Sequence, residues 1–147
     1  MLGRRGTGAV SLMVVDLDDF KAHNDRFGHD AGDDLLVWTA ATIGDLLPDD
    51  ASLGRIGGDE FAIVLPGLDA LASYALAASI RLALEARTSA TVGLAVGVAG
   101  RTELAELLRA AGDAVRDAKV VGKGCVRVAT PPPAPRISAA ATAVPVL

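Results

Sequence analysis

The chain has 147 residues and a mass of 14.9 kDa, which is enough for one domain with a hydrophobic core and too little for two. Apolar residues make up 51% and charged residues 22%, a composition typical of globular proteins and not of disordered or fibrous ones. The net charge of −4, without a basic stripe, argues against binding to polymeric nucleic acid. The single cysteine, Cys125, excludes an internal disulfide framework and a thiolate zinc site, and it fits the reducing cytoplasm.

Neither a secretion signal nor a membrane span is expected. Arg4 and Arg5 are followed by a short apolar run that reaches Asp16 without a small-residue cleavage site. The uncharged stretch Ala70–Ile80 is well short of the roughly 20 residues that cross a bilayer. We therefore expect a cytoplasmic protein with no membrane partner.

The first third of the chain predicts a strand and two helices. Residues 10–15 form a β-branched apolar run, which predicts a buried strand that delivers Asp16 and Asp18 at its end. Residues 19–27 predict a short helix with Phe20 and Phe27 on one face, closed by Gly28. A second helix ends at Pro48; its apolar positions are Leu36, Ala40, Ile43 and Leu47, and Asp30, Asp33 and Asp34 are expected in its first turn.

The middle of the chain predicts a hairpin and then alternating helices and strands. Residues 52–65 predict two strands joined at Gly57 and Gly58, which are expected to take positive φ in the turn. An Ala-rich helix over 68–86 and a strand over 91–98 follow, the strand being weakened by Gly93 and Gly97. A last helix over 103–118 is expected to turn Leu104, Leu107, Leu108 and Val115 inward, and a short strand covers 126–129.

This order of elements predicts an α+β domain in which helices flank a mixed, largely antiparallel sheet of about five strands, although an α/β label is also defensible. We expect a short lead-in over residues 1–9, the domain over 10–129 and a disordered Pro/Ala-rich tail over 130–147.

Three clusters of polar residues carry the functional signal. They are Asp16-Leu-Asp-Asp-Phe-Lys21 with Asn24-Asp25, then Gly28-His-Asp-Ala-Gly-Asp33, and finally Arg55-Ile-Gly-Gly-Asp-Glu-Phe61. In order and spacing the clusters resemble the signature of the GGDEF family, the diguanylate cyclases. A weaker block, Ala114–Lys119 followed by Gly122 and Lys123, is similar to the closing stretch of that family. The resemblance covers roughly residues 10–129 and implies the nucleotidyl-cyclase palm-like fold.

Asp16 and Asp59 are the candidate metal ligands. A strand end and a neighbouring hairpin tip that bring two carboxylates together make a hard oxygen site suited to Mg²⁺. The resemblance implies two Mg²⁺ or Mn²⁺ ions per active site, the backbone carbonyl of Leu17 as a further ligand, and Asp59 and Glu60 as the catalytic pair, with Asp59 activating the 3′-hydroxyl. Acidic residues at such positions are otherwise solvated, but all three clusters occur together here.

The candidate phosphate-binding residues are two glycines and the three lysines of the chain: Gly57, Gly58, Lys21, Lys119 and Lys123. Glycine lets a triphosphate approach the backbone amides, and lysine supplies a point charge for phosphate oxygens. An ordinary hairpin turn and solvated surface lysines are the alternative interpretations.

The resemblance places Asn24 and Asp33 at the guanine-reading positions. A carboxylate accepts from both N1–H and N2–H₂ of guanine, and an amide serves the remaining edge, whereas adenine would leave Asp33 facing an acceptor. The alternative interpretation of Asp33 is charge matching at a helix start, and that of Asn24 is a surface helix residue. We interpret His29 as a structural loop residue, because no second metal-ligating histidine or thiolate lies at ligand spacing.

Several positions depart from the family pattern. The D-x-L-T-G-L-x-N-R-R segment expected ahead of the first strand has no counterpart that we map, and we expect no preceding sensor domain. The product-inhibition motif R-x-x-D is replaced by Pro48-Asp-Asp-Ala51, so no such site is predicted. In the closing block, Gly112 and Arg116 replace the usual acidic residue and tyrosine.

Two functions from different classes follow from these features. The first is a diguanylate cyclase that condenses two GTP into cyclic di-GMP and pyrophosphate across a homodimer. The second is a catalytically weak or inactive GTP-binding module that signals to a partner. A truncated, poorly folding remnant is a third interpretation. A separate sensor or effector protein is a possible partner in either functional case.

Overall fold

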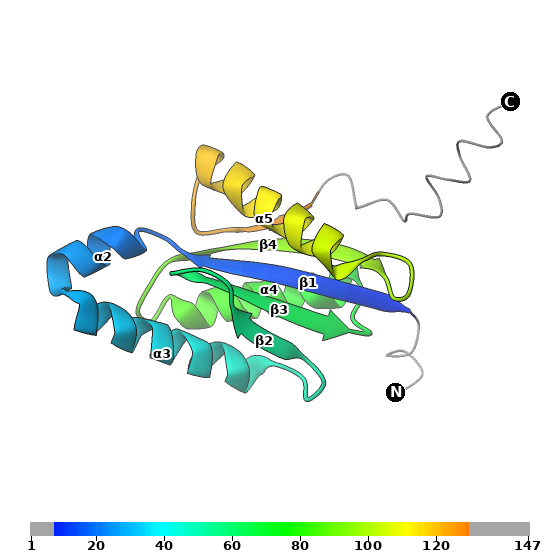
Figure 1. The fold of residues 1–147 in the computed structure, drawn as a ribbon, viewed down its shortest axis with the longest axis horizontal. Coiled ribbons are helices and arrows are strands. Elements are labelled where there is room, and N and C mark those ends of the chain that lie inside the picture. Colours follow the sequence, from blue (N-terminus) through cyan, green and yellow to red (C-terminus); the bar gives the residue numbers. More distant parts are fainter. Residues whose placement is uncertain (1–7, 130–147) are drawn as a thin grey trace, which may run out of the picture.

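A computed structural model describes residues 8–129 (Figure 1). The disordered tail predicted over 130–147 and most of the predicted lead-in lie outside the described residues. Within residues 8–129, five strands and four helices follow one another in the order β1 (Ala9–Leu17), α2 (Phe20–Phe27), α3 (His29–Leu46), β2 (Ser52–Arg55), β3 (Glu60–Pro66), α4 (Ala70–Leu84), β4 (Ala90–Val98), α5 (Leu104–Val121) and β5 (Val126–Val128). Every predicted element is present.

The strands form one mixed sheet in the order β2-β3-β1-β4-β5. The central strand β1 runs antiparallel to both β3 and β4, and only β4 and β5 are parallel. The predicted α+β class and largely antiparallel sheet are therefore confirmed. In this register Asp16 lies opposite Glu60, and Leu17 lies opposite Ala90.

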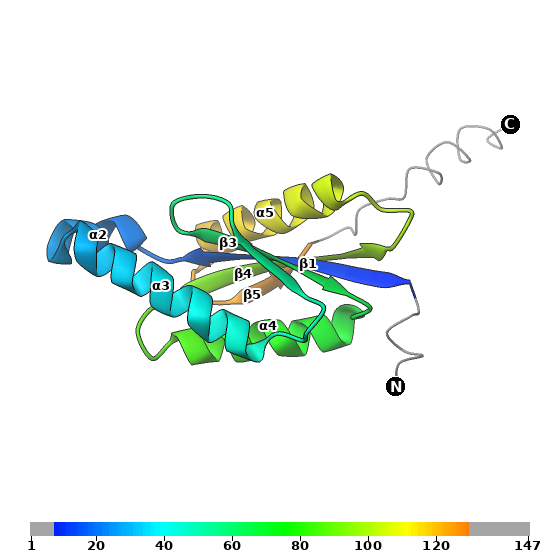
Figure 2. The same ribbon diagram turned by 60° about the horizontal axis from the view of Figure 1, so that its bottom comes forward.

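Helices cover both faces of the sheet: α3 and α4 lie on one face and α5 on the other (Figure 2). Side chains alternate along β1, so Met13, Val15 and Leu17 join the core under α3 and α4. Val10, Leu12 and Val14 point the other way and pack with α5. A strand buried on both faces reads as a continuous apolar run, as residues 10–15 do. No helix within residues 8–129 is long and apolar enough to cross a membrane.

Gly93 sets how closely α5 approaches the sheet. A Cβ at this position would lie 2.1 Å from the carbonyl oxygen of Ala111 on α5. The glycine, interpreted from the sequence as weakening β4, thus provides the space into which the α5 backbone packs.

Four expectations from the sequence are wrong in detail. Neither Gly57 nor Gly58 has a positive φ, because the chain between β2 and β3 is longer than a two-residue turn and closes with a hydrogen bond from Ile56 N to the Glu60 carbonyl at 2.9 Å. The helix α3 begins at His29, so His29 is an exposed helix residue and not part of a loop, and Asp33 and Asp34 lie beyond the first turn.

The fourth correction concerns α5. Leu107 and Val115 are buried as predicted, but Leu104 and Leu108 are 51% and 37% exposed. The buried stripe of α5 consists of Leu107, Ala111, Ala114, Val115 and Ala118. Leu104 and Leu108 lie on its flank, because small residues and not these leucines face the sheet.

Candidate active site

The candidate site lies where the C-terminal end of β1 meets the start of β3. The strand pairing sets Asp16 beside Glu60, and Leu17 N donates a hydrogen bond to the Asp59 carbonyl at 3.1 Å. Residues from two distant motifs are thereby fixed next to each other by the backbone of the sheet. The carboxylates are thus held on rigid strand ends.

Lys119, from the last turn of α5, reaches into this group. Its Nζ donates to Asp16 Oδ1 at 2.7 Å, lies 3.2 Å from Asp18 Oδ1, and lies 3.5 Å from the Leu17 carbonyl oxygen. The lysine side chain is 26% exposed and the Asp16 side chain 13%. A partly buried ion pair of this kind is screened much less by salt than a surface pair.

Asp18 is a site residue to which the sequence analysis assigned no role. Its side chain is 1% exposed and accepts hydrogen bonds from Ser89 Oγ at 2.6 Å and Thr91 Oγ1 at 2.8 Å. Thr91 Oγ1 in turn accepts from Gly124 N at 3.0 Å. The spacing of two residues between Asp16 and Asp18 at the end of β1 could have indicated that both side chains lie on the same face of the sheet. The hydroxyl partners of Asp18 could not be predicted in this way, because they come from β4 and the loop before it.

The carboxylates crowd one another. Burial and the charge of Asp16 raise the pKa of Asp59. Hydrogen bonding to Asp16 is the main cause that raises the pKa of Glu60, followed by burial and by the charges of Asp16 and Asp59. Partial burial lowers the pKa of Lys119, but hydrogen bonds and charges from Asp16 and Asp18 together outweigh it and raise this pKa overall. These crowded carboxylates therefore favour the binding of an added cation.

This donor set fits a hard divalent cation. The candidate ligands are those predicted from the sequence, the Asp16 and Asp59 carboxylates with the Leu17 carbonyl. Within residues 8–129, no three His, Cys, Asp or Glu side chains are arranged as a metal cluster. Carboxylate and carbonyl oxygens suit Mg²⁺ and Mn²⁺. The Lys119 ammonium already lies against Asp16 and the Leu17 carbonyl, so these oxygens attract a positive charge.

The predicted guanine readers lie together on the α2–α3 pair. Asn24 Oδ1 is buried and has no hydrogen-bond partner among residues 8–129, which is rare for a polar atom. Asn24 packs against Gly32, the residue before Asp33. Asp33 is exposed and lines a hollow of about 410 Å³ with Leu36, Val37, Ala40, Leu53, Gly54, Arg55 and Phe61.

Residues 2–125 match the family model described as diguanylate cyclase, GGDEF domain. The chain belongs to the GGDEF family. It is 33% identical over 137 residues to the probable diguanylate cyclase DgcC of Escherichia coli K12, covering 86% of this chain and 36% of that protein. The GGDEF domain described here thus spans about a third of the length of that relative.

Solved GGDEF structures have the same fold. The active GGEEF domain of a diguanylate cyclase from Vibrio cholerae matches with a TM-score of 0.78 at 28% identity, covering 87% of each chain. The GGDEF domain of DgcB from Caulobacter crescentus, in complex with c-di-GMP, matches with a TM-score of 0.78 at 26% identity, covering 87% of this chain and 82% of that one.

The remaining predicted phosphate residues of this GGDEF domain are less closely gathered. Lys21 pairs with Asp25 along α2 at 3.6 Å, and Lys123 pairs with Asp19 at 2.6 Å, so neither contacts Asp16 in this structure. Gly57 adjoins the catalytic candidates: a Cβ there would lie 3.1 Å from Glu60 Oε1, whereas Gly58 faces open space. Of the three lysines, only Lys119 contacts carboxylates of the candidate site, those of Asp16 and Asp18.

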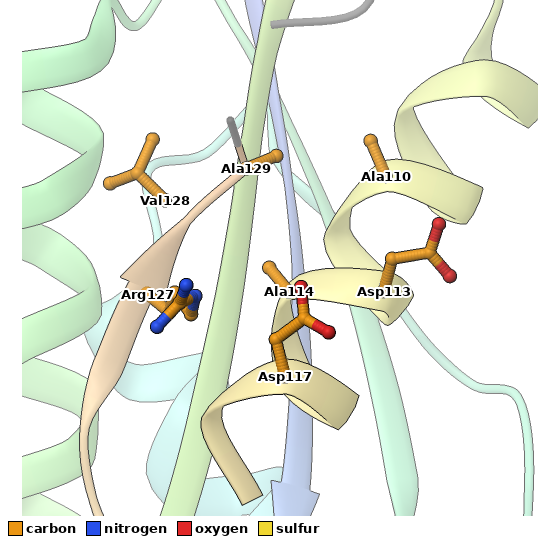
Figure 3. Close-up of a pocket in the computed structure, with 7 residues that line it drawn as sticks. All are labelled: Ala110, Asp113, Ala114, Asp117, Arg127, Val128 and Ala129. Atoms are coloured by element: carbon orange, nitrogen blue, oxygen red, sulfur yellow. The ribbon is translucent and has the colours of Figure 1, made fainter. Parts of the chain in front are cut away.

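Two further hollows flank α5 in the GGDEF domain. One of about 170 Å³ contains Glu60 together with Val14, Ile56, Leu108, Arg109, Gly112 and Arg116. The other, of about 220 Å³, lies between α5 and β5, where Asp113 and Asp117 project from the helix and Arg127 from the strand (Figure 3). No predicted site residue lines the second hollow, so it does not belong to the candidate site.

Proposed function

We propose that this GGDEF domain is a diguanylate cyclase that condenses two GTP into cyclic di-GMP and releases two pyrophosphates. The observation that carries the proposal is the gathering of Asp16, Asp59 and Glu60 with Lys119 at one end of the sheet. Family membership and the active GGEEF domain of Vibrio cholerae support the same reaction.

In the proposed reaction Asp59, with Glu60 beside it, accepts the proton of the ribose 3′-hydroxyl. The 3′-oxygen then attacks the α-phosphorus of the second GTP, and the bond to pyrophosphate breaks. The same attack in the opposite direction, by the 3′-oxygen of the second nucleotide, closes the ring and releases the second pyrophosphate. Asp16, Asp59 and the Leu17 carbonyl would hold Mg²⁺ or Mn²⁺, two ions per site, and these ions supply charge neutralisation of the triphosphate. Lys21, Lys119, Lys123 and the Gly57–Gly58 backbone are proposed to contact the phosphates.

Specificity for guanine is proposed to come from Asn24 and Asp33. Among the described residues Asn24 Oδ1 lacks a donor, and an amino group of guanine would supply one once the amide turns from Gly32 toward the base. A base that offers no donor there would leave the atom unpaired. Discrimination of this kind reaches about 10⁴-fold in sites built on polar groups.

A homodimer is part of the proposal, because each protomer presents one GTP and two must meet. We propose that the enzyme works in the cytoplasm and that a separate sensor or effector protein regulates it. Incubation with GTP and Mg²⁺ over a range of protein concentrations, followed by chromatography for cyclic di-GMP and pyrophosphate, tests the reaction. Product that rises faster than linearly with protein concentration is expected for a dimerising cyclase.

Two variants at Asp59 sharpen that experiment. Asp59→Asn removes the proposed base and should lower the rate by at least about 10²-fold. Asp59→Glu keeps the carboxylate, as in the GGEEF domain of Vibrio cholerae, and should retain activity. An unchanged rate in the Asn variant would refute the assigned chemistry.

A second candidate is a GTP-binding module that turns over weakly or not at all. It is favoured by Gly112 and Arg116, which depart from the family pattern and line the hollow beside Glu60. Arg116 also lowers the pKa of Glu60 against the larger effects that raise it. Binding of GTP by a folded sample without product at high protein concentration would identify this function.

A further inference from the structure

The ammonium of Lys119 stands where the proposed metal would make its contacts. It lies 2.7 Å from Asp16 Oδ1 and 3.5 Å from the Leu17 carbonyl oxygen, two of the three proposed ligand atoms. Mg²⁺ approaches oxygen ligands at about 2.0–2.1 Å. An ammonium and a divalent ion on the same two oxygens would repel each other strongly at such range. The two cations therefore compete for these oxygens.

Asp18 gives the lysine a second partner, one that is buried and held by several hydrogen bonds. Its carboxylate is 1% exposed and is held by Ser89 Oγ at 2.6 Å and Thr91 Oγ1 at 2.8 Å. Its backbone is tied as well, because Asp18 N donates to the Ser89 carbonyl at 2.9 Å. Among the described side chains, Asp16 by contrast hydrogen-bonds to Lys119 and Glu60.

We infer that Lys119 is an exchangeable internal cation that neutralises Asp16 in the free domain, yields Asp16 and the Leu17 carbonyl to the metal, and stays tethered by Asp18. The inference rests on the proposed function, since it presumes a metal at Asp16. Once displaced, the ammonium needs a new anionic partner beside Asp18. A nucleotide triphosphate supplies one, so metal and triphosphate assist each other in binding.

This arrangement has a measurable consequence for the metal alone. Without nucleotide, a divalent ion must displace the ammonium, and its affinity is reduced by that competition. Removing the lysine charge therefore strengthens metal binding to the nucleotide-free domain. A lysine that only binds phosphate from a distance would change this affinity little, as the more distant Lys123 should.

The test is a calorimetric titration of the nucleotide-free protein with Mn²⁺. Lys119→Met removes the ammonium and keeps an unbranched side chain only one atom shorter. Lys123→Met is the matched control, because it removes the same charge from the neighbouring pair with Asp19. We expect Lys119→Met to bind Mn²⁺ at least about fivefold more tightly than wild type, the lower end of the range for coupled sites, and Lys123→Met to resemble wild type.

Asp16→Asn separates this inference from the proposed function. If Mn²⁺ binding depends on Asp16 but Lys119→Met binds no more tightly than Lys123→Met, the exchange is refuted and the metal site stands. If Asp16→Asn leaves Mn²⁺ binding unchanged in every background, both proposals fail. Should Lys119→Met not fold, as judged by thermal unfolding, Lys119→Gln replaces it with the same expected result.

Discussion

Asn24 and Gly32 fit together so closely that a Cβ on Gly32 would lie 1.8 Å from Asn24 Oδ1. Gly32→Ala should therefore displace the Asn24 amide from its position on α2 and weaken GTP binding at least about tenfold. The affinity is measured by titration with a non-hydrolysable GTP analogue.

The control is Gly44→Ala on the same helix, where a Cβ meets nothing within 4 Å. It should leave nucleotide affinity unchanged and stabilise the domain by up to about 1 kcal/mol, because alanine is the better helix former. Equal GTP affinities in the two variants would show that the position of Asn24 does not matter for binding.

Gly93→Ala should destabilise the domain by at least about 1–3 kcal/mol, the usual cost of overpacking a core. The added Cβ would meet the carbonyl oxygen of Ala111 at 2.1 Å, and a helix backbone cannot rotate away as a side chain can. Chemical denaturation measures the change in the free energy of unfolding. Gly54→Ala on β2, where a Cβ meets nothing within 4 Å, is the control and should unfold at a denaturant concentration close to that of wild type.

Asp18→Asn should lower the free energy of unfolding by about 1–3 kcal/mol, because it removes a buried charge that pairs with Lys119 and accepts from two hydroxyls. The neighbouring variant Asp19→Asn breaks only an exposed pair with Lys123, and asparagine tolerates the positive φ of 57° found there. Its melting temperature should match that of wild type. Similar losses in both variants would contradict the structural role of Asp18.

Asp59→Asn should raise the melting temperature of the metal-free domain at pH 7 while it abolishes catalysis. Burial and the charge of Asp16 raise the pKa of Asp59 in the folded state, so the ionised form is unfavourable there. The folded state then binds more protons than the unfolded state above the ordinary Asp pKa, and stability falls as the pH rises through that window.

The raised pKa of Asp59 also predicts how the stability gained by Asp59→Asn depends on pH. The stability gained by Asp59→Asn should be fully present at neutral pH in EDTA and should shrink as the pH falls below about 4, where Asp59 is protonated in both states. Thermal unfolding at several pH values measures it. A gain that is the same at pH 3.5 and pH 7 would mean that charge crowding is not its cause.

The sequence by itself determined the elements and the family. Apolar periodicity located every strand and helix, and the Gly57-Gly58-Asp59-Glu60-Phe61 motif with its two companions indicated the GGDEF fold. These are local properties: side-chain alternation, helix periodicity and breaker residues act within a few neighbours along the chain.

Only the tertiary structure decided which polar groups meet. Lys119 and Asp16 are 103 positions apart in sequence and touch because α5 packs across β1, with Gly93 admitting the helix backbone. The partners of Asp18 come from β4 and the loop before it, because β1 and β4 pair in the register that sets Asp16 opposite Thr91. Such contacts depend on the register of the strands and on how closely a helix packs against the sheet. Both are set by the packing of the whole core and not by any local sequence pattern.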